Sequence, residues 1–295
     1  MRKASLLPAL SAGFGLIRRA PGSVIVWGLV AFALAMIPFL LMLGLMGPQF
    51  LTGGTTAASP ALILLQPVQM LIGLVSTALI YSGIYRAILR PEDKGFAYLK
   101  LGQDEFHFGV TLIVLWILGV IAVIGLVLAF IIPLVIVGMS NSDAGAAVIS
   151  LLILIAFVAL LVPAVRLGMA LPMTIAERRI RIFEAWGFTK GYTGSLVAMA
   201  LLQLLMIIGL YLALVVLVVG LAFATIGSVS FMDEAGLQAF FQNPANLGAI
   251  IPAVTVFGVV ILVLSFVITP ILVAPWARAY QLIAEAKGDK SEVFA

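Results

Sequence analysis

The chain has 295 residues, of which 64% are hydrophobic and 9% are charged, and its formal net charge is +4. Its mean hydropathy is +1.27, and a soluble domain has about 45 to 50% apolar residues, so the composition excludes a soluble globular protein and predicts an integral membrane protein. There is no cysteine, which excludes disulfides, thiolate nucleophiles and metal sites built on cysteine.

Long apolar runs define the membrane segments. The four longest runs without Asp, Glu, Lys or Arg are Ala20–Tyr85, Phe106–Ser142, Gly191–Met232 and Ala235–Ala277. Each is long enough for at least one spanning helix of about 20 residues, and the first for two. Runs such as Leu151–Val162 are apolar on every face, unlike the alternating strands of an outer-membrane barrel. We therefore expect spanning helices.

The first part of the chain predicts a surface helix followed by a helical hairpin. Leu6–Ile17 carries large apolar residues near one helical face, which is typical of a helix lying at a membrane interface. Arg18 and Arg19 follow it without a signal-peptidase site, so we expect the segment to be retained. Spans are then predicted at about Ser23–Gly47 and Ala61–Tyr85, joined by a linker rich in glycine, threonine and proline.

The middle of the chain repeats this order. Phe96–Phe108 mixes aromatic and charged residues and is predicted to be a second interfacial element. A third span follows at about Gly109–Val137, and a fourth begins near Ala146. The fourth span leads into the charged stretch Met173–Gly191, which lies between two apolar runs.

Arg166, near the end of the fourth span, has two possible settings. If the helix continues to Glu177, Arg166 lies about 16 Å deeper than that end and needs a partner, because a charge in the membrane costs roughly 2.5 to 3.5 kcal/mol. If the helix ends at Arg166, the side chain extends to the interface. Pro172 is compatible with the second geometry, and the sequence leaves both open.

The last hairpin completes six spans. A fifth span is predicted at about Ser195–Ala224 and a sixth at about Leu247–Pro275, with a longer loop over residues 227–246. The sixth helix can continue to Gly288, and residues 289–295 form a tail. The predicted fold class is an all-α polytopic membrane protein in a single domain, 1–295.

Charge supports this topology. With six spans, all sixteen Lys and Arg lie on one side, whereas the other side carries the acidic residues Asp143, Asp233 and Glu234. The positive-inside rule then predicts a bacterial inner (plasma) membrane protein with both termini cytoplasmic. The tryptophans Trp27, Trp116, Trp186 and Trp276 lie toward the same side, which is typical of an aromatic belt.

Three glycine pairs suggest an internal repeat. Gly15/Gly22, Gly102/Gly109 and Gly187/Gly194 share the spacing Gly-x6-Gly, and each pair precedes a hairpin. We predict three parallel repeats of about 1–94, 95–180 and 181–288, each an interfacial amphipathic helix followed by a hairpin. The alternative is that glycines simply mark chain reversals at the interface.

The sequence offers little catalytic chemistry. His107 is the single histidine, and the chain has no Gly-x-Ser-x-Gly motif, phosphate-binding loop or dinucleotide fingerprint. We expect no cofactor, no metal site and no enzymatic activity. An intramembrane lipid-modifying enzyme would need His107, or Glu177 with Glu184, at a cleft that lipid can reach.

The candidate binding residues are basic or polar. Anionic lipid is the expected partner of the basic face, with nucleic acid not expected, and a membrane-protein partner or a second copy of the chain left open. Candidates for lipid headgroup or partner binding are Arg86, Arg166, Arg178, Arg179, Arg181, Lys190 and Arg278. The candidates for an intramembrane polar site are Gln66, Gln69 and Gln203. The alternative function is a small transporter or channel along the pseudo-threefold axis, bounded by Arg166 and Gln203.

One stretch resembles a known group. Pro172–Glu177, followed by EAWGFTKG over residues 184–191, resembles a connector in bacterial inner-membrane proteins that include the membrane domain of some glycerophosphodiester phosphodiesterases and the YciC-like proteins. The resemblance covers six spans in rough layout and about twenty residues in detail. It departs where the family often continues with a basic or aromatic residue after Lys-Gly, since Tyr192-Thr193-Gly194 follows here. It implies a multi-spanning, lipid-related protein without an established activity, because the phosphodiesterase chemistry belongs to a separate soluble domain.

Overall fold

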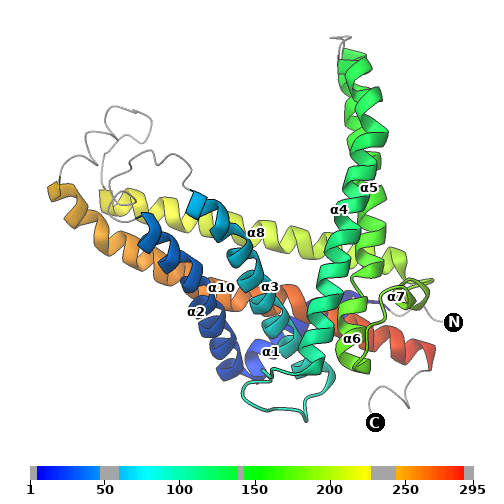
Figure 1. Cartoon of the computed structure of the whole chain (residues 1–295), viewed down its shortest axis with the longest axis horizontal. Coiled ribbons are helices and arrows are strands. Elements are labelled where there is room, and N and C mark those ends of the chain that lie inside the picture. Colours follow the sequence, from blue (N-terminus) through cyan, green and yellow to red (C-terminus); the bar gives the residue numbers. More distant parts are fainter. Residues whose placement is uncertain (1–4, 47–59, 139–142, 227–243, 289–295) are drawn as a thin grey trace.

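A computed structural model describes residues 5–46, 60–138, 143–226 and 244–288, and these residues form helices, turns and one isolated bridge. Figure 1 shows the helices in chain order. They are η1 (Leu7–Ser11), α1 (Ala12–Arg19), α2 (Pro21–Met46), α3 (Pro60–Leu89), α4 (Gln103–Gly138), α5 (Asp143–Leu167), α6 (Ala170–Glu177), α7 (Glu184–Phe188), α8 (Thr193–Ile226) and α10 (Pro244–Lys287). Of the predicted linkers at 48–60 and 227–246, residues 48–59 and 227–243 lie outside the described residues, as does the tail at 289–295, whereas Pro60 begins α3 and residues 244–246 begin α10.

Six stretches of these helices are long and apolar enough to cross a membrane, which confirms the all-helical class and the expected number of spans. The helix bounds also follow the apolar runs. α10 continues beyond Pro275 to Lys287, as the sequence allowed. α5 ends at Leu167, where the N–H of Gly168 donates to the carbonyl of Ala164 at 2.8 Å, and α6 starts at Ala170 after two intervening residues. The helix that carries Arg166 therefore ends one residue beyond it.

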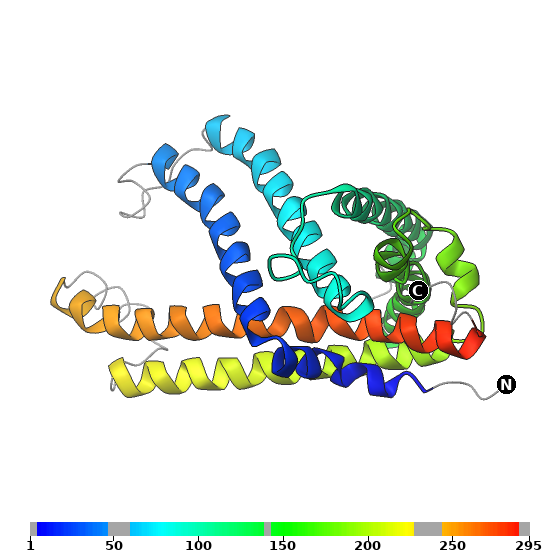
Figure 2. The same cartoon turned by 90° about the horizontal axis from the view of Figure 1, so that it is seen from below.

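The six long helices contact one another in a ring. Within each pair, α2 packs on α3, α4 on α5, and α8 on α10. The second helix of each pair also packs on the first helix of another pair: α3 contacts α4, α5 contacts α8, and α10 contacts α2. Figures 1 and 2 show that the N-terminal ends of α2, α4 and α8 and the C-terminal ends of α3, α5 and α10 gather together, while the opposite ends of the three pairs diverge.

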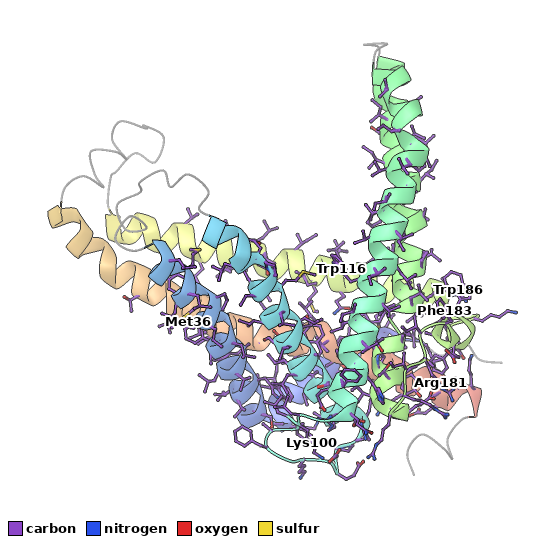
Figure 3. All side chains as sticks on the ribbon, viewed as in Figure 1. Met36, Lys100, Trp116, Arg181, Phe183 and Trp186 are labelled. Atoms are coloured by element: carbon purple, nitrogen blue, oxygen red, sulfur yellow. The ribbon has the colours of Figure 1, made fainter. Side chains whose placement is uncertain are left out.

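The buried core lies where these ends gather. Tyr85, Phe108, Leu196 and Tyr280 are almost fully buried there. The diverging halves instead expose large apolar side chains on all sides, as Figure 3 shows along α4 and α5. This distribution suits helices whose outer surface faces lipid rather than water.

The N-terminal segment is helical, as predicted, and packs on α10. Leu6 and Leu16 of this segment are buried, so part of its apolar face is covered by protein. Gly13 permits the close approach: a Cβ at this position would lie 2.5 Å from Cα of Ile271 and 2.8 Å from the carbonyl oxygen of Pro270. The backbone of α1 therefore touches the backbone of α10.

The prediction of a helix in the second interfacial element is wrong for residues 96–102. This stretch forms turns and an isolated bridge between Phe96 and Leu99, and α4 begins only at Gln103. Ala97 and Tyr98 have φ of 51° and 62°, which a right-handed helix does not allow. The indole N–H of Trp27 donates to the carbonyl of Ala97 at 2.7 Å and holds this shape.

Candidate functional site

Arg86 is the centre of a buried ion-pair network at the junction of α3 and α4. Its side chain is fully buried, pairs with the carboxylate of Glu105 and donates to the carbonyl of Tyr98. One guanidinium nitrogen also lies 3.7 Å from Asp104, and its Nε lies 3.7 Å from Asp93. The structure thus gives Arg86 protein partners and no free surface for a lipid headgroup.

The rest of this network is more exposed. Arg90 pairs with Asp104 at 2.7 Å, and Lys100 pairs with Asp93. Nε of Arg86, and Nε and Nη1 of Arg90, are buried without a hydrogen-bond partner. A small cavity of about 220 Å³ adjoins Arg86, and exposed Arg178 forms part of its wall. The acidic and basic side chains around this cavity are balanced in number, so it does not favour an anion.

Asp93 gives the network a dependence on pH. The hydrogen bond from Lys100 lowers the pKa of Asp93; partial burial raises it, and the charges of Lys100, Arg86 and Arg90 lower it further. Because the folded-state pKa is lowered, this stabilisation is complete above the ordinary Asp pKa of about 3.9 and is lost as the pH falls through the lowered value.

We expect Asp93→Asn to reduce the free energy of unfolding at pH 6 by less than about 1 kcal/mol, since Asp93 lies near the surface. The difference from the wild-type protein should shrink as the pH falls through the lowered pKa of Asp93, because the wild-type protein then loses the carboxylate charge as well. Unfolding in mixed SDS and detergent micelles, followed from pH 6 to pH 3, measures the difference in the free energy of unfolding between the variant and the wild type. A difference that grows at pH 3 would contradict the argument.

Arg166 is held by the connecting segment that precedes α8. Its Nε donates to the hydroxyl of Thr189 at 3.1 Å, and another guanidinium nitrogen donates to the carbonyl of Trp186. The guanidinium carbon also lies 3.8 Å from the centre of the Trp186 ring, a cation–π arrangement. The side chain is half-buried, so its charge is satisfied by this segment.

Basic and large apolar side chains alternate on the exposed surface of residues 178–190, here named the basic-aromatic segment. Phe183 is 72% exposed and Trp186 42% exposed, and both are labelled beside Arg181 in Figure 3. Arg181 pairs with Glu177 at 2.8 Å, and Arg179 lies 3.7 Å from the same carboxylate. Arg178 and Lys190 are exposed, and among the described residues neither has an ion-pair partner.

The remaining predicted residues lie apart from one another. Arg278 donates to the side chain of Gln281 at 2.8 Å on α10. Gln66 and Gln69 are exposed on α3, whereas Gln203 on α8 is 5% exposed and donates to the carbonyl of Leu272 on α10. The structure therefore does not bring the three glutamines into one polar site.

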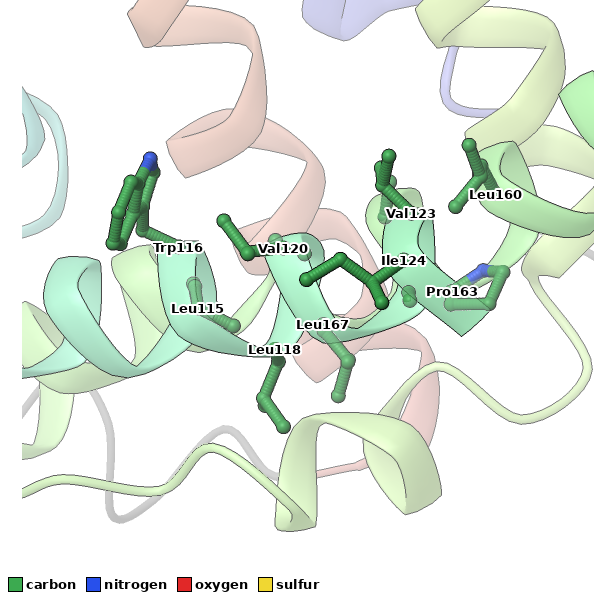
Figure 4. Close-up of a pocket in the computed structure, with 13 residues that line it drawn as sticks. Leu115, Trp116, Leu118, Val120, Val123, Ile124, Leu160, Pro163 and Leu167 are labelled. Atoms are coloured by element: carbon green, nitrogen blue, oxygen red, sulfur yellow. The ribbon is translucent and has the colours of Figure 1, made fainter. Parts of the chain in front are cut away.

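Gln203 instead lines a cavity of about 510 Å³, here named the central cavity, among α3, α5, α6, α8 and α10. Sequence reasoning missed two polar residues of its wall, Tyr81 and Tyr85. Their spacing of four residues, which puts them on one face of α3, is the signal that identifies them. A larger groove of about 740 Å³ between α4 and α5 is lined by aliphatic residues and Trp116, as Figure 4 shows.

Neither the comparisons with known proteins nor the residues of the enzymatic alternative add a second site to the cavities and contacts described above. No family model, curated protein or solved structure matches this chain. The residues named for an enzymatic alternative are not gathered at a cleft: His107, Glu177 and Glu184 line none of the cavities described above. Within the described ranges, no group of acidic or histidine side chains is arranged to hold a metal ion.

Proposed function

We propose that this protein is a non-enzymatic integral membrane protein that binds anionic lipid headgroups through the basic-aromatic segment. The observation that carries this proposal is that Phe183 and Trp186 are exposed in the same short segment as the exposed Arg178 and Lys190. Aromatic rings at the interface bury apolar area among the lipid chains, while neighbouring cations attract phosphate groups with about 1 kcal/mol each.

The other two connecting segments have the same character, which supports a shared role. Phe14 in the first segment is 47% exposed, and Leu101 in the second is 85% exposed. Arg18 and Arg19 lie near the former, and Lys100 near the latter. Three such segments at one end of the molecule form a surface suited to organising anionic lipid or to holding a membrane-protein partner.

The proposal includes the finer architecture and the location. The ring of helix contacts, in which each pair packs on the next, is the pattern expected of three parallel repeats. The one-sided distribution of Lys and Arg supports a bacterial inner membrane with cytoplasmic termini. The resemblance of residues 172–191 to connectors of lipid-related inner-membrane proteins agrees with this role.

Neutralising Arg178, Arg179 and Arg181 together to glutamine is expected to weaken phosphatidylglycerol binding about tenfold. The loss is smaller than three independent cations would give, since two of the arginines share Glu177. Purified full-length protein is titrated with short-chain phosphatidylglycerol, and bound lipid is counted by native mass spectrometry. Phosphatidylcholine of the same chain length is the matched control. Equal binding by variant and wild type would overturn the proposal.

A small transporter or channel is the second candidate, and the central cavity is the observation that favours it. Its wall includes Gln203, one of the two residues predicted to bound a pathway. Arg166, the other, is not part of that wall and is held by Thr189 and Trp186. A pathway through this cavity would therefore rely on Gln203 and the two tyrosines.

A further inference from the structure

We propose that the central cavity binds the uncharged, hydrogen-bonding head of a single-chain amphiphile whose chain lies in the groove between α4 and α5. This site is separate from the basic-aromatic segment and does not rest on it. The central cavity has polar groups without partners, a wall without charges and an adjoining apolar groove.

The polar groups come from two helices. Tyr81 and Tyr85 lie one turn apart on α3, and Gln203 enters from α8. Tyr85 is only 2% exposed, with its ring 5.7 Å from that of Phe108, yet its hydroxyl forms no hydrogen bond with any described residue. Tyrosine hydroxyls inside a protein normally have a partner; the Tyr85 side chain lines the central cavity, so a molecule in the cavity is expected to supply that partner.

Gln203 is held in a defined orientation. Its side-chain N–H donates to the carbonyl of Leu272 in α10, and its amide oxygen has no donor among the described residues. The cavity thus presents one fixed acceptor together with two hydroxyls that donate or accept. A head with hydroxyl groups matches this set, because it supplies both donors and acceptors.

The wall of the central cavity disfavours a ligand with a charged head. Besides Tyr81, Tyr85, Gln203 and Trp276, the lining consists of aliphatic residues, glycine and one phenylalanine, and includes no Asp, Glu, Lys or Arg. An ionised head would lie in an apolar environment without a counter-charge, at a cost of several kcal/mol. An uncharged head avoids this cost.

The adjoining groove accounts for the chain of the ligand. Ala164 and Gly168 line both the central cavity and the groove of about 740 Å³, so the two spaces meet at the end of α5. The groove wall consists of aliphatic residues, Pro163 and Trp116 (Figure 4). A polar cavity wall joined to an apolar groove fits a molecule with a small polar head and one long apolar chain.

Monooleoylglycerol tests the proposal, with oleoyl lysophosphatidate as a probe that has the same chain and a charged head. Isothermal titration of the purified full-length protein should show saturable binding of one monooleoylglycerol, and at least tenfold weaker binding of lysophosphatidate to the same site in competition. Equal affinity for the two probes, or no saturable binding, would overturn the proposal.

Three variants locate the site. Tyr85→Phe removes only the hydroxyl and should weaken monooleoylglycerol binding five- to tenfold. Ala164→Phe places a ring where the two spaces meet and should abolish binding, whereas Ala159→Phe, on the same helix at an exposed position outside both linings, should bind as the wild type does. Unchanged binding in Tyr85→Phe, or equal binding in the two phenylalanine variants, contradicts the assignment.

The same titration separates the two proposals. The variant with Arg178, Arg179 and Arg181 changed to glutamine should bind monooleoylglycerol with unchanged affinity, because none of these residues lines the central cavity. Loss of monooleoylglycerol binding in that variant would place the ligand on the basic-aromatic segment and contradict the cavity site.

Discussion

Arg86→Met is expected to lower the free energy of unfolding by about 3 to 5 kcal/mol. The substitution leaves Glu105, which is 7% exposed, without the cation that pairs with it, and removes the donor to the carbonyl of Tyr98. A buried carboxylate without a cation is costly because one hydroxyl, that of Ser82 at 3.4 Å, does not replace the water that it has lost. Reversible unfolding in mixed SDS and detergent micelles provides the measurement.

Two control variants separate the ion pair from a general effect of losing an arginine. The double variant Arg86→Met/Glu105→Leu removes both charges and should recover much of the lost stability, since replacing a whole buried pair by apolar groups is often nearly neutral. Arg178→Met changes an exposed arginine beside the same cavity and should cost less than about 0.5 kcal/mol. A double variant less stable than Arg86→Met would refute the pairing argument.

Gly13→Ala should destabilise the protein by about 2 kcal/mol, although alanine is the better helix former. The added Cβ would lie 2.5 Å from Cα of Ile271, so either α1 or α10 must move. Neither neighbour is a flexible side chain, because both nearest atoms belong to the backbone of α10. The same micellar unfolding assay measures the loss.

Gly15→Ala, in the same helix, is the matched control and should raise the free energy of unfolding instead of lowering it. A Cβ at Gly15 would meet nothing closer than the guanidinium of Arg19 at 3.9 Å. The gain in helix propensity then remains and amounts to about 0.5 to 1 kcal/mol. Losses of equal size in the two variants would show that the contact between α1 and α10 is not the cause.

The sequence was sufficient for the six long helices but not for the segment before α4. Apolar runs of the length of a bilayer leave helix as the one way to satisfy the backbone, so the spans follow directly. The turns over residues 96–102 depend on left-handed backbone at Ala97 and Tyr98, residues with no marked preference for it. Trp27 and Arg86 hold this shape from other helices, and no local pattern contains that information.

The candidate residues differ in burial and in their partners, and the sequence does not show these differences for a similar reason. Gln66 and Gln203 lie in helices that are apolar on nearly every face, so no periodicity shows that the first is exposed and the second buried. Arg86 and Arg166 were expected to share one role, yet the acids around Arg86 make it a buried ion-pair partner, and the segment before α8 holds Arg166. Only the packing of one helix pair on the next distinguishes them.

The ion pair of Arg86 also has a consequence for the order of assembly. Arg86 ends the first helix pair, but its partner Glu105 lies nineteen residues later, in the first turn of α4. During synthesis the guanidinium must therefore remain solvated until that turn has left the ribosome. The first pair can enter the membrane beforehand, but Arg86 at its end can pair with Glu105 only when the second pair begins to insert.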